Sequence, residues 1–456
     1  MGRKYDFDYI VIGSGPAGSA AALALAKTKK RVALVESKYF GGSNINTRDI
    51  PYSVTLDFAH TYHKASHFPE FSHQDFSFNF PTIIAHQLKA IIQSGGGNNQ
   101  KSYTDAGAIC LHGYANFLDA NTIAIGDQKF TSYNFIIATG SHLNTSAIAG
   151  TDAVNYLTPD TAIKIRRLPK AVLIVGGGST GCEIAEYYAK LGAKAIIMEK
   201  SSRILPREDK EVSATVTDYF TNNLGIMVLT NSKVIALEQD DASKRVIFQN
   251  DHTEKMIRVD CIVLATGSEP NTDLGLENAK VKYTTTGIKV DKTFQTSAKN
   301  IYAIGDCISS DSSTERADYE GNLLAVNIIN KTKNTANYTG FARVTNTCPA
   351  VVTIGLSEDD LIRRKRKYKK SIVYLKDTPA SKIFNVRHGF VKLLTDRSNH
   401  MLGGCIVAPH ATAMSGEIAL AVRHHLTALE LASTPSITND FSYVIKLAAK
   451  KLVKKK

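Results

Sequence analysis

The stretch Tyr9-Ile-Val-Ile-Gly-Ser-Gly-Pro-Ala-Gly18 leads from a short apolar run into a glycine-rich turn. A helix-like segment follows, and a second apolar run at residues 32–35 ends in Glu36, 23 positions after Gly13. Such glycines let the backbone turn tightly and approach a pyrophosphate at a helix N-terminus, and the acid can accept a hydrogen bond from a ribose hydroxyl. The stretch therefore predicts a dinucleotide-binding βαβ unit.

The same unit recurs in the middle of the chain. Residues 171–175 are apolar, Gly176-Gly-Gly-Ser-Thr-Gly181 follows, and Glu199 stands 23 positions after Gly176. Each copy is followed downstream by the tetrapeptide Ala-Thr-Gly-Ser, at residues 138–141 and 265–268. Two copies with a long period indicate a duplicated nucleotide site rather than a solenoid. Two such sites imply two cofactors and electron transfer between them.

Composition is that of a globular protein. The chain has 456 residues, enough for two or three domains, with 43% hydrophobic and 21% charged residues. Its six cysteines show no CxxC or CxxxxC spacing, which favours reduced thiols over a disulfide framework or a zinc ribbon. The apolar run at residues 20–26 is too short to span a membrane. We therefore expect a cytoplasmic protein.

Four further stretches resemble the FAD-dependent pyridine-nucleotide disulfide oxidoreductases, the family of dihydrolipoamide dehydrogenase, glutathione reductase and mercuric reductase. The likeness runs from Tyr5 to the region of Lys450 and implies a homodimer with an α/β fold: two Rossmann-like domains and a C-terminal α+β interface domain. The stretches are Gly41-Gly-Ser-Asn-Ile-Asn-Thr-Arg-Asp-Ile-Pro51, Arg203-Ile-Leu-Pro206, Pro270-Asn-Thr272 and Ile301-Tyr-Ala-Ile-Gly-Asp306. The expected domains are FAD-binding (1–150 and 271–342), NAD(P)-binding (151–270) and interface (343–456).

The motifs and the resemblance together assign the cofactor-binding residues. For FAD they are Gly13, Gly15, Pro16, Ala17, Gly18, Glu36, Gly42, Ser43, Thr139, Gly140, Asp306 and Ala317. For the nicotinamide nucleotide they are Gly176, Gly178, Thr180, Gly181, Glu199 and Gly267. An acid at the end of the second strand favours the free ribose hydroxyls of NAD and repels a 2′-phosphate. Glu199 therefore indicates NADH over NADPH, although Lys200 and Arg203 nearby weaken that preference.

The resemblance also implies which chemistry is missing. The family has two redox cysteines at the positions of Asn44 and Asp49, and its partner-subunit His-Glu pair falls at Thr438 and Tyr443. Disulfide reduction needs one thiol that exchanges with substrate and another that contacts the flavin. Activity as a disulfide reductase is therefore not expected.

Three residues are assigned to the chemistry that remains. Glu183 corresponds to a family glutamate near flavin N5, where hydride arrives, and its lysine partner is replaced here by Ser53. Without that partner, the pKa of a semi-buried carboxyl should rise. Arg48 either supplies positive charge beside the flavin, where it would stabilise the anionic reduced form, or points to solvent. Asp49 would manage a proton on the acceptor side.

We therefore expect an FAD-dependent oxidoreductase that takes hydride from NADH and passes electrons directly to a small, diffusible acceptor. A quinone, oxygen and a second pyridine nucleotide all qualify. The alternative is a non-catalytic flavin- and nucleotide-binding regulatory protein. Activity as a true dihydrolipoamide dehydrogenase or mercuric reductase is less expected, because the residues that it needs are replaced.

Five other residues invite a functional interpretation. Cys307 and Cys348 would be the substitutes for the missing redox thiols, although cysteines commonly pack as small hydrophobes. His60, His63 and His67 should share one face of a helix. Satisfied or solvated histidines are commoner than a metal site built from three helical histidines, so no metal is expected.

Two basic clusters lie at residues 363–370 and 450–456 of a chain with a net charge of +13. Such clusters permit weak contact with an anionic membrane surface, and solvated surface charge is the simpler interpretation. Nucleic-acid binding is not expected, because neither aromatic interleaving nor a binding motif accompanies the charges.

Overall fold

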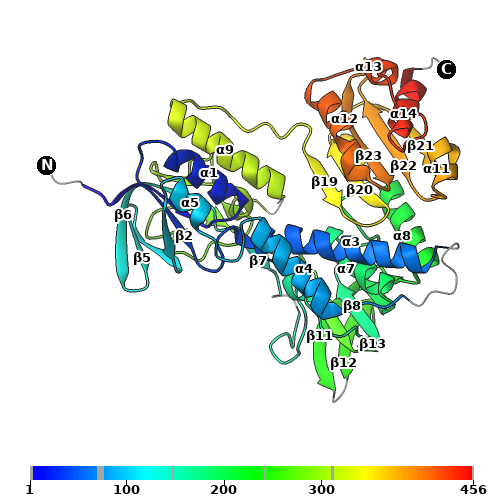
Figure 1. Ribbon diagram of the computed structural model, residues 1–456, viewed down its shortest axis with the longest axis horizontal. Helices are drawn as coiled ribbons and strands as arrows, with labels where there is room; N and C mark the ends of the chain where they lie inside the picture. The colour runs from blue at the N-terminus through cyan, green and yellow to red at the C-terminus, as the bar shows by residue number, and fades with distance from the viewer. Residues whose placement is uncertain (1–3, 69–75, 146–147, 241–242, 310–312, 454–456) are drawn as a thin grey trace. The chain divides into compact units, whose positions relative to one another are not determined.

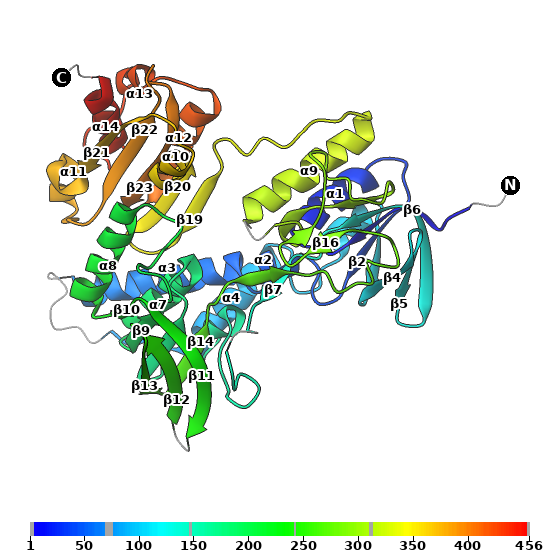
Figure 2. The ribbon, with the colours of Figure 1, turned by 180° about the vertical axis from the view of Figure 1, so that it is seen from behind.

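The computed structural model describes residues 4–68, 76–145, 148–240, 243–309 and 313–453. The chain divides into two compact units. The first consists of Met1–Thr55, Asn79–Asn144 and Gly267–Asn337, and the second of Leu56–Phe78, Thr145–Thr266 and Tyr338–Lys456. Figures 1 and 2 show the elements of both units from two sides. Each unit thus assembles segments that are far apart in the sequence.

A seven-stranded sheet forms the centre of the first unit. Its order is β3-β2-β1-β6-β5-β4, and β18 also pairs with β6. Strand β1 lies between β2 and β6 and is parallel to both. Its apolar residues are buried, as expected for a parallel strand covered on both faces. The strands are β1 Phe7–Ile12, β2 Val32–Glu36, β3 Ile109–His112, β4 Ala115–Asp119, β5 Thr122–Ile125, β6 Gln128–Ile137 and β18 Ile301–Ala303.

Helices α1 (Pro16–Ala26) and α9 (Thr314–Asn330) pack against each other beside this sheet. Their backbones approach closely, because a Cβ added to Gly321 of α9 would lie 2.2 Å from the carbonyl oxygen of Ala17. The other helices of this unit are α2 Gly42–Asn46, α4 Phe80–Gln93, α5 Lys101–Asp105 and the 3-10 turn η2 Gly305–Cys307. Two short strand pairs complete it: β7 Ser141–Leu143 with β15 Ser268–Pro270, and β16 Tyr283–Thr284 with β17 Gly287–Ile288. Helix α3 (Asp49–Ser66) begins in the first unit and ends in the second.

The second unit contains a parallel sheet of order β10-β9-β8-β14 and an antiparallel sheet of order β11-β12-β13 (Figure 2). Helix α7 (Ser179–Lys190) joins β8 to β9 and packs on both strands, so β8-α7-β9 repeats the β1-α1-β2 arrangement. The strands are β8 Ala171–Val175, β9 Lys194–Met198, β10 Met227–Leu229, β11 Ser232–Asp240, β12 Ser243–Asn250, β13 Thr253–Val259 and β14 Cys261–Leu264. The other helices are α6 Pro159–Ala162 and α8 Lys210–Leu224.

The C-terminal part of the second unit is a five-stranded antiparallel sheet of order β19-β20-β23-β22-β21. Helices α12 and α14 pack on it and enclose an apolar core. The strands are β19 Ala342–Thr345, β20 Ala350–Gly355, β21 Lys369–Tyr374, β22 Phe390–Thr395 and β23 Met401–Ala408. The helices are α10 Glu358–Arg363, α11 Pro379–Ile383, α12 Ala411–Arg423, α13 Ala428–Ser433 and α14 Tyr443–Val453, with the 3-10 turn η3 Leu375–Asp377.

These elements confirm the predicted α/β fold with two Rossmann-like βαβ units and a C-terminal α+β part. The apolar run at residues 20–26, too short for a membrane span, lies within α1. Among the described residues, no helix is long and apolar enough to cross a bilayer. All six cysteines are free thiols, as expected. The residue boundaries assigned to the separate domains stay predictions.

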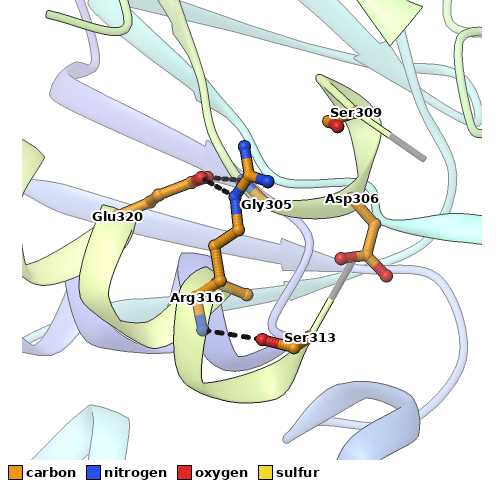
Figure 3. A pocket seen from close by; sticks show the side chains of 7 residues that line it. Gly305, Asp306, Ser309, Ser313, Arg316 and Glu320 are labelled. Carbon is orange, nitrogen blue, oxygen red and sulfur yellow. Dashed lines mark hydrogen bonds and ion pairs between the residues drawn. The ribbon is translucent and has the colours of Figure 1, made fainter. Parts of the chain in front are cut away.

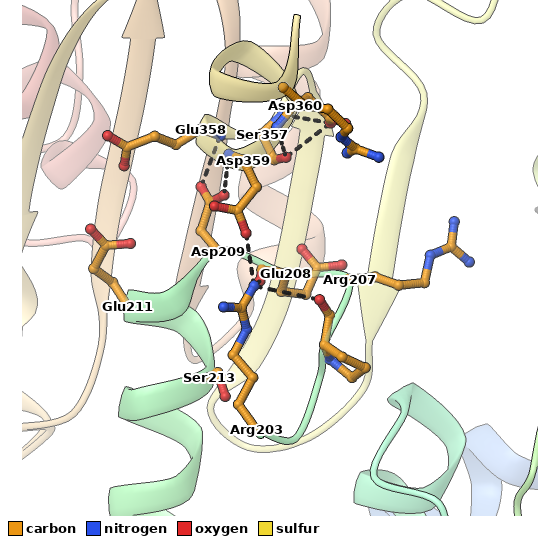
Figure 4. A network of polar contacts seen from close by, with 12 residues as sticks. Arg203, Arg207, Glu208, Asp209, Glu211, Ser213, Ser357, Glu358, Asp359 and Asp360 are labelled. Atoms are coloured by element: carbon orange, nitrogen blue, oxygen red, sulfur yellow. Dashed lines mark hydrogen bonds and ion pairs between the residues drawn. The ribbon is translucent and has the colours of Figure 1, made fainter. Parts of the chain in front are cut away.

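A buried lysine ties α8 and α10 to the C-terminal sheet. The side chain of Lys392, on β22, is fully buried, and its Nζ lies 2.8 Å from Asp209, 2.9 Å from Glu211 and 2.9 Å from Glu358. Figure 4 shows these three carboxylates on one side of a larger polar network. Their oxygens are close enough to hold a metal ion, and the ammonium of Lys392 supplies the cation instead.

The carboxylates of this network also hold backbone groups. Asp209 accepts hydrogen bonds from the amides of Glu358 and Asp359, both at 3.2 Å, at the start of α10. Glu358 accepts one from the Tyr368 hydroxyl at 2.6 Å and another from Lys370 at 2.8 Å. Although burial opposes ionisation, these donors and Lys392 lower the pKa of Glu358 to about 2. The ion pairs between Lys392 and these carboxylates therefore stabilise the fold, and an apolar residue at position 392 would remove them.

We predict that Lys392→Met destabilises the protein by ~3–5 kcal/mol at neutral pH, because two buried carboxylates and one half-buried carboxylate lose their cation. In the wild type, the contribution of Glu358 is present above its unfolded pKa and is lost as the pH falls through its folded pKa of about 2. In the variant, the carboxyl pKa values should rise, so acidification towards pH ~5 should recover stability. Urea unfolding at both pH values measures this. Lys370→Met, at a half-exposed member of the network, is the control and should cost under ~1 kcal/mol; equal losses in the two variants would contradict the prediction.

Candidate functional site

The first glycine-rich turn contains glycines of two kinds. A Cβ on Gly13, where φ is +103°, would lie 2.2 Å from the Ala138 carbonyl oxygen, and one on Gly18 would lie 1.9 Å from the Gly13 oxygen. These two glycines are required by packing. Gly15, the N-cap of α1, has φ −63°, and a Cβ there would meet nothing within 4 Å. The space in front of Gly15 and of the helix N-terminus suits a phosphate group.

The second glycine-rich turn also contains glycines that packing requires and a glycine that faces open space. A Cβ on Gly176 would lie 2.3 Å from the Ala265 carbonyl oxygen, and one on Gly181 would lie 1.9 Å from the Gly176 oxygen. Gly178, with φ −72°, again faces open space. The alanine of each Ala-Thr-Gly-Ser tetrapeptide therefore contacts the first glycine of its own turn. This contact is a physical reason for the duplicated tetrapeptide, and the sequence pattern alone does not reveal it.

The two strand-end acids hold the turns themselves. Glu36 accepts hydrogen bonds from the Ser14 amide at 2.9 Å and the Ser14 hydroxyl at 2.6 Å. Glu199 accepts one from the Gly177 amide at 2.7 Å and one from the Ser201 amide at 2.8 Å. Both acids are buried. A ribose hydroxyl would share oxygens that already accept bonds, so the predicted ribose contacts stay predictions.

The Gly41–Pro51 segment lies directly on the first turn. A Cβ on Gly42, where φ is +67°, would be 2.4 Å from the Cα of Gly15. The Gly41 amide donates to the Ser14 hydroxyl at 3.1 Å. Buried Asn46 donates to the carbonyls of Phe40 and Gly42, at 3.0 and 2.8 Å, and accepts from the Gly97 amide at 2.8 Å. The sequence assigned no role to Ser14 or Asn46, although Asn46 belongs to the family pattern.

Asp49 and Arg48 lie at the start of α3. The Asp49 carboxylate accepts a hydrogen bond of 2.6 Å from the hydroxyl of Thr314, at the start of α9. Desolvation of the carboxyl raises the pKa of Asp49, with repulsion from Glu315 in the same direction, while Thr314 and the positive charge of Arg48 oppose the rise. Arg48 is half-buried, and its charge also acts to lower the pKa of Asp306. This favours a local electrostatic role for Arg48 over a solvent-facing one.

Asp306 lies in a pocket of the first unit. Burial raises the pKa of its carboxyl to about 6, although the hydroxyl of Ser141, which donates at 3.3 Å, opposes the rise. Arg316 and Glu320 form an ion pair of 2.9 Å at the pocket wall, and Glu320 also accepts from the Gly305 amide at 2.7 Å. Figure 3 shows these side chains around the pocket. The pocket is lined by Gly305, Asp306, Ser309, Ser313, Arg316, Ala317 and Glu320.

The remaining predicted cofactor residues lie in or beside the two turns. Thr139 donates to the Asn271 carbonyl at 2.8 Å, which holds the Ala-Thr-Gly-Ser turn of the first unit. Ala17 is buried against α9, whereas Ser43 is exposed. Gly140 and Gly267 adopt φ of +69° and +93°, where a side chain would be strained. Three others are placed by their helices: Pro16 begins α1, and Thr180 and Gly181 lie in the first turn of α7.

Helix α7 carries two buried acids. Glu183 accepts a hydrogen bond of 2.6 Å from the Asn346 amide. Glu186 is fully buried, forms an ion pair of 2.9 Å with Lys190 and accepts from the Cys348 amide at 3.0 Å. Burial alone would raise the pKa of Glu186, but Lys190 and His60 lower it. The two acids therefore hold the segment before Pro349, a role that the sequence did not predict. The raised pKa expected for Glu183 stays a prediction, and Ser53 is exposed.

The three histidines have different surroundings. Nε2 of His60 lies 3.3 Å from Glu186. The ring centroids of His63 and His67 lie 4.1 Å apart with the planes tilted by 34°, and burial lowers the pKa of His63 to about 4. In the part of the chain that the structure describes, the one group of side chains with metal-ligand spacing is Asp209, Glu211 and Glu358, so it includes none of these histidines.

No thiol of this chain has the environment of a reactive cysteine. Burial raises the pKa of all six, to about 12 for Cys307 and to about 11 for Cys261. A redox-active cysteine instead needs a lowered pKa and partial exposure. The side chains at positions 44 and 49, the predicted counterparts of the family cysteines, also differ in their contacts. Asp49 bonds to Thr314, whereas Asn44 is half-buried and makes no hydrogen bond with the described residues.

The open turns, the strand-end acids and the Asp306 pocket are features of a two-nucleotide flavoprotein, and comparison with known proteins identifies the class. The family model described as pyridine nucleotide-disulphide oxidoreductase matches residues 7–327, and that of its dimerisation domain matches residues 341–449. The chain belongs to the pyridine nucleotide-disulphide oxidoreductase family. It is thus a flavoprotein oxidoreductase of a family that binds FAD and NAD(P), and its dimerisation domain supports a homodimer.

Individual relatives include dihydrolipoyl dehydrogenase of Buchnera aphidicola, 31% identical over 95% of this chain and 93% of the relative. The mercuric reductase of Bacillus cereus is 27% identical over 98% of this chain and 71% of the relative. Among solved structures, the HOCl-induced flavoprotein disulfide reductase RclA from Escherichia coli has a TM-score of 0.87 at 21% identity, covering 98% of this chain and all of the other. That likeness shows the fold alone.

We predict that Gly15→Ala and Gly178→Ala leave the fold intact and each weaken binding of one nucleotide. Both positions have φ values that alanine adopts, and an added Cβ meets no protein atom. In nucleotide-free protein, each variant should therefore be at least as stable as the wild type, with a gain of up to ~1 kcal/mol. Gly15→Ala should lower the flavin content of the purified protein. Gly178→Ala should weaken NADH binding, which calorimetry measures. Gly18→Ala is the control, because its Cβ clash should unfold the protein; loss of flavin through Gly178→Ala alone would contradict the assignment.

A second prediction concerns Asp306. In flavin-free protein, its raised pKa means that the folded state favours the protonated carboxyl. The stability that the protonated carboxyl of Asp306 contributes is complete below pH ~4 and is lost as the pH rises through about 6. Asp306→Asn should therefore stabilise flavin-free protein at pH ~8 by roughly 1–3 kcal/mol and have little effect at pH ~4. Thermal unfolding across this range measures it, with Asp127→Asn, at an exposed acid, as the control. A pH-independent effect of Asp306→Asn would contradict the prediction.

Proposed function

We propose that this protein is an FAD-dependent NAD(P)H oxidoreductase that passes electrons to a small acceptor other than a disulfide. A quinone, another diffusible acceptor or a second pyridine nucleotide would serve. Residues 1–150 and 271–342 would bind FAD, 151–270 would bind the nicotinamide nucleotide, and 343–456 would form the dimer interface. Bound FAD would supply the capacity to accept a hydride and to release its electrons singly or in pairs.

The observation that carries the proposal is the state of the thiols. Asn44 and Asp49 occupy the two family cysteine positions, and burial raises the pKa of every cysteine in the chain. Because the thiolate is the reactive form in disulfide exchange, neither position and none of the six thiols is suited to that reaction. The names of the relatives describe the relatives. Membership of the same family does not by itself determine the electron acceptor of this protein.

The residues at the vacated positions support direct contact with an acceptor. Asn44 offers both a donor and an acceptor for hydrogen bonds, since its amide has no partner among the described residues. Desolvation raises the pKa of Asp49, which is the direction that favours uptake of a proton by its carboxyl. Thr314 would orient Asp49, and Arg48 would favour negative charge nearby. Glu183, held by the Asn346 amide, is the third proposed catalytic residue.

Two observations, one at Glu199 and one at Arg203, support NADH as the preferred donor. Glu199 is held as a buried carboxylate at the end of β9 by two backbone amides, and a carboxylate there repels a 2′-phosphate. Arg203, the nearby cation that could have offset it, is tied to Asp359 at 2.7 Å and to the Glu208 carbonyl at 3.0 Å. We further propose a cytoplasmic location, with weak contact to an anionic membrane surface where the acceptor is a membrane quinone.

The decisive test is an anaerobic NADH titration of the purified protein, followed by its visible spectrum. The flavin band should bleach and should recover on addition of menadione, and steady-state NADH oxidation with menadione should exceed that with lipoamide or glutathione disulfide by at least ~100-fold. Comparable turnover with a disulfide would overturn the proposal. A flavin that stays oxidised in excess NADH and NADPH would instead indicate a non-catalytic nucleotide-binding protein.

We also predict that the missing chemistry can be restored in part. The double variant Asn44→Cys/Asp49→Cys reintroduces thiols at both family positions and should reduce the disulfide reagent DTNB with NADH at least ~10-fold faster than the wild type. The Asn44→Ser/Asp49→Ser variant lacks sulfur at the same positions and should show no gain. A wild type that already reduces DTNB as fast as the cysteine variant would contradict both the prediction and the proposed acceptor class.

A further inference from the structure

Two basic segments that are distant in the sequence lie on adjacent elements of the second unit. The hydroxyl of Ser371, on β21, donates to the Ala448 carbonyl of α14 at 2.8 Å, and Lys451 of α14 donates to the Ile372 carbonyl at 3.0 Å. Figure 1 shows α14 beside β21. The cluster at residues 363–370 leads into β21, and the basic end of α14 lies beside the same strand.

The cations before β21 are presented by an ordered turn. After α10, the Lys365 amide donates to the Ile362 carbonyl at 3.0 Å and the Arg366 amide to the Leu361 carbonyl at 2.9 Å. Residues 364–367 are all exposed, and within the described chain none of them forms an ion pair. We call residues 364–367 the basic face. Its charge is therefore not neutralised by neighbouring acids.

The surroundings of the basic face favour a lipid surface over a nucleic acid. Ile362, directly before the cations, has 59% of its surface exposed, and cations beside exposed apolar residues are the composition of a membrane-surface contact. Proteins that bind single-stranded nucleic acid present aromatic rings on which bases stack. The aromatic residue of residues 363–370, Tyr368, is half-buried and donates its hydroxyl to Glu358 at 2.6 Å, so it is held away from such a role.

We propose that the basic face docks the protein on a membrane surface rich in anionic phospholipid, and that a lipid-soluble quinone is the electron acceptor. The docking stands on the charges and exposures above. The choice of a quinone rests on the proposed function. Each cation near an anionic surface strengthens attraction by roughly fivefold, and the attraction weakens with salt because it acts through solvent.

Co-sedimentation with vesicles tests the docking in the full-length, flavin-loaded protein. Wild type should bind vesicles of phosphatidylglycerol and phosphatidylcholine, release them at high salt, and ignore pure phosphatidylcholine. The variant Arg364→Gln/Lys365→Gln/Arg366→Gln/Lys367→Gln should lose more than ~100-fold in binding. A matched control removes four exposed lysines of the first unit and should bind like the wild type; these are Lys280, Lys282, Lys289 and Lys292.

Two results would overturn the docking: no binding of wild type to anionic vesicles, or equal binding by the wild type and the basic-face variant. Retention on poly(U) at a salt concentration that abolishes vesicle binding would also overturn it, in favour of nucleic acid. Turnover separates docking from the proposed function. With a water-soluble quinone the basic-face variant should match the wild type, and with a vesicle-embedded quinone it should be slower. Vesicle binding without any quinone turnover would support the docking and contradict only the choice of a quinone as electron acceptor.

Discussion

The close backbone contact between a glycine turn and an alanine carbonyl is the constraint on which the nucleotide sites depend. In the first unit Gly13 lies against Ala138, and in the second Gly176 lies against Ala265, at distances that leave no room for a Cβ. Each contact holds the end of one strand against the turn that follows another. In both units the N-cap glycine, Gly15 or Gly178, faces open space and leaves the helix N-terminus accessible to a phosphate.

The position of the Gly41–Pro51 segment is set by its contacts with the first glycine turn. Gly42 packs on Gly15, Ser14 joins the segment to Glu36, and Asn46 closes it with three hydrogen bonds. None of these contacts involves positions 44 and 49. The fold of the segment therefore does not depend on the side chains at positions 44 and 49, so the proposed loss of a dithiol there is compatible with the family scaffold.

Charge is used in two opposite ways in the second unit. Lys392 is fully buried among three carboxylates, where burial and close partners make its interactions strong. The cations at residues 364–367, directly after α10, are exposed and make no ion pairs within the described residues. Buried charge of the first kind holds elements together, whereas exposed charge of the second kind acts on whatever approaches the surface.

The sequence by itself determined the fold class and both βαβ units, and it has no cysteine at positions 44 and 49. These follow from local patterns: glycine spacing, apolar runs that end in Glu36 and Glu199, and residue types at positions 44 and 49. Only the tertiary structure decided which groups meet across long separations. Thr314 on Asp49, Asn346 on Glu183 and the buried cation of Lys392 each join residues more than 150 positions apart. Burial sets the pKa of every cysteine in the same way, because desolvation depends on packing that no local pattern encodes.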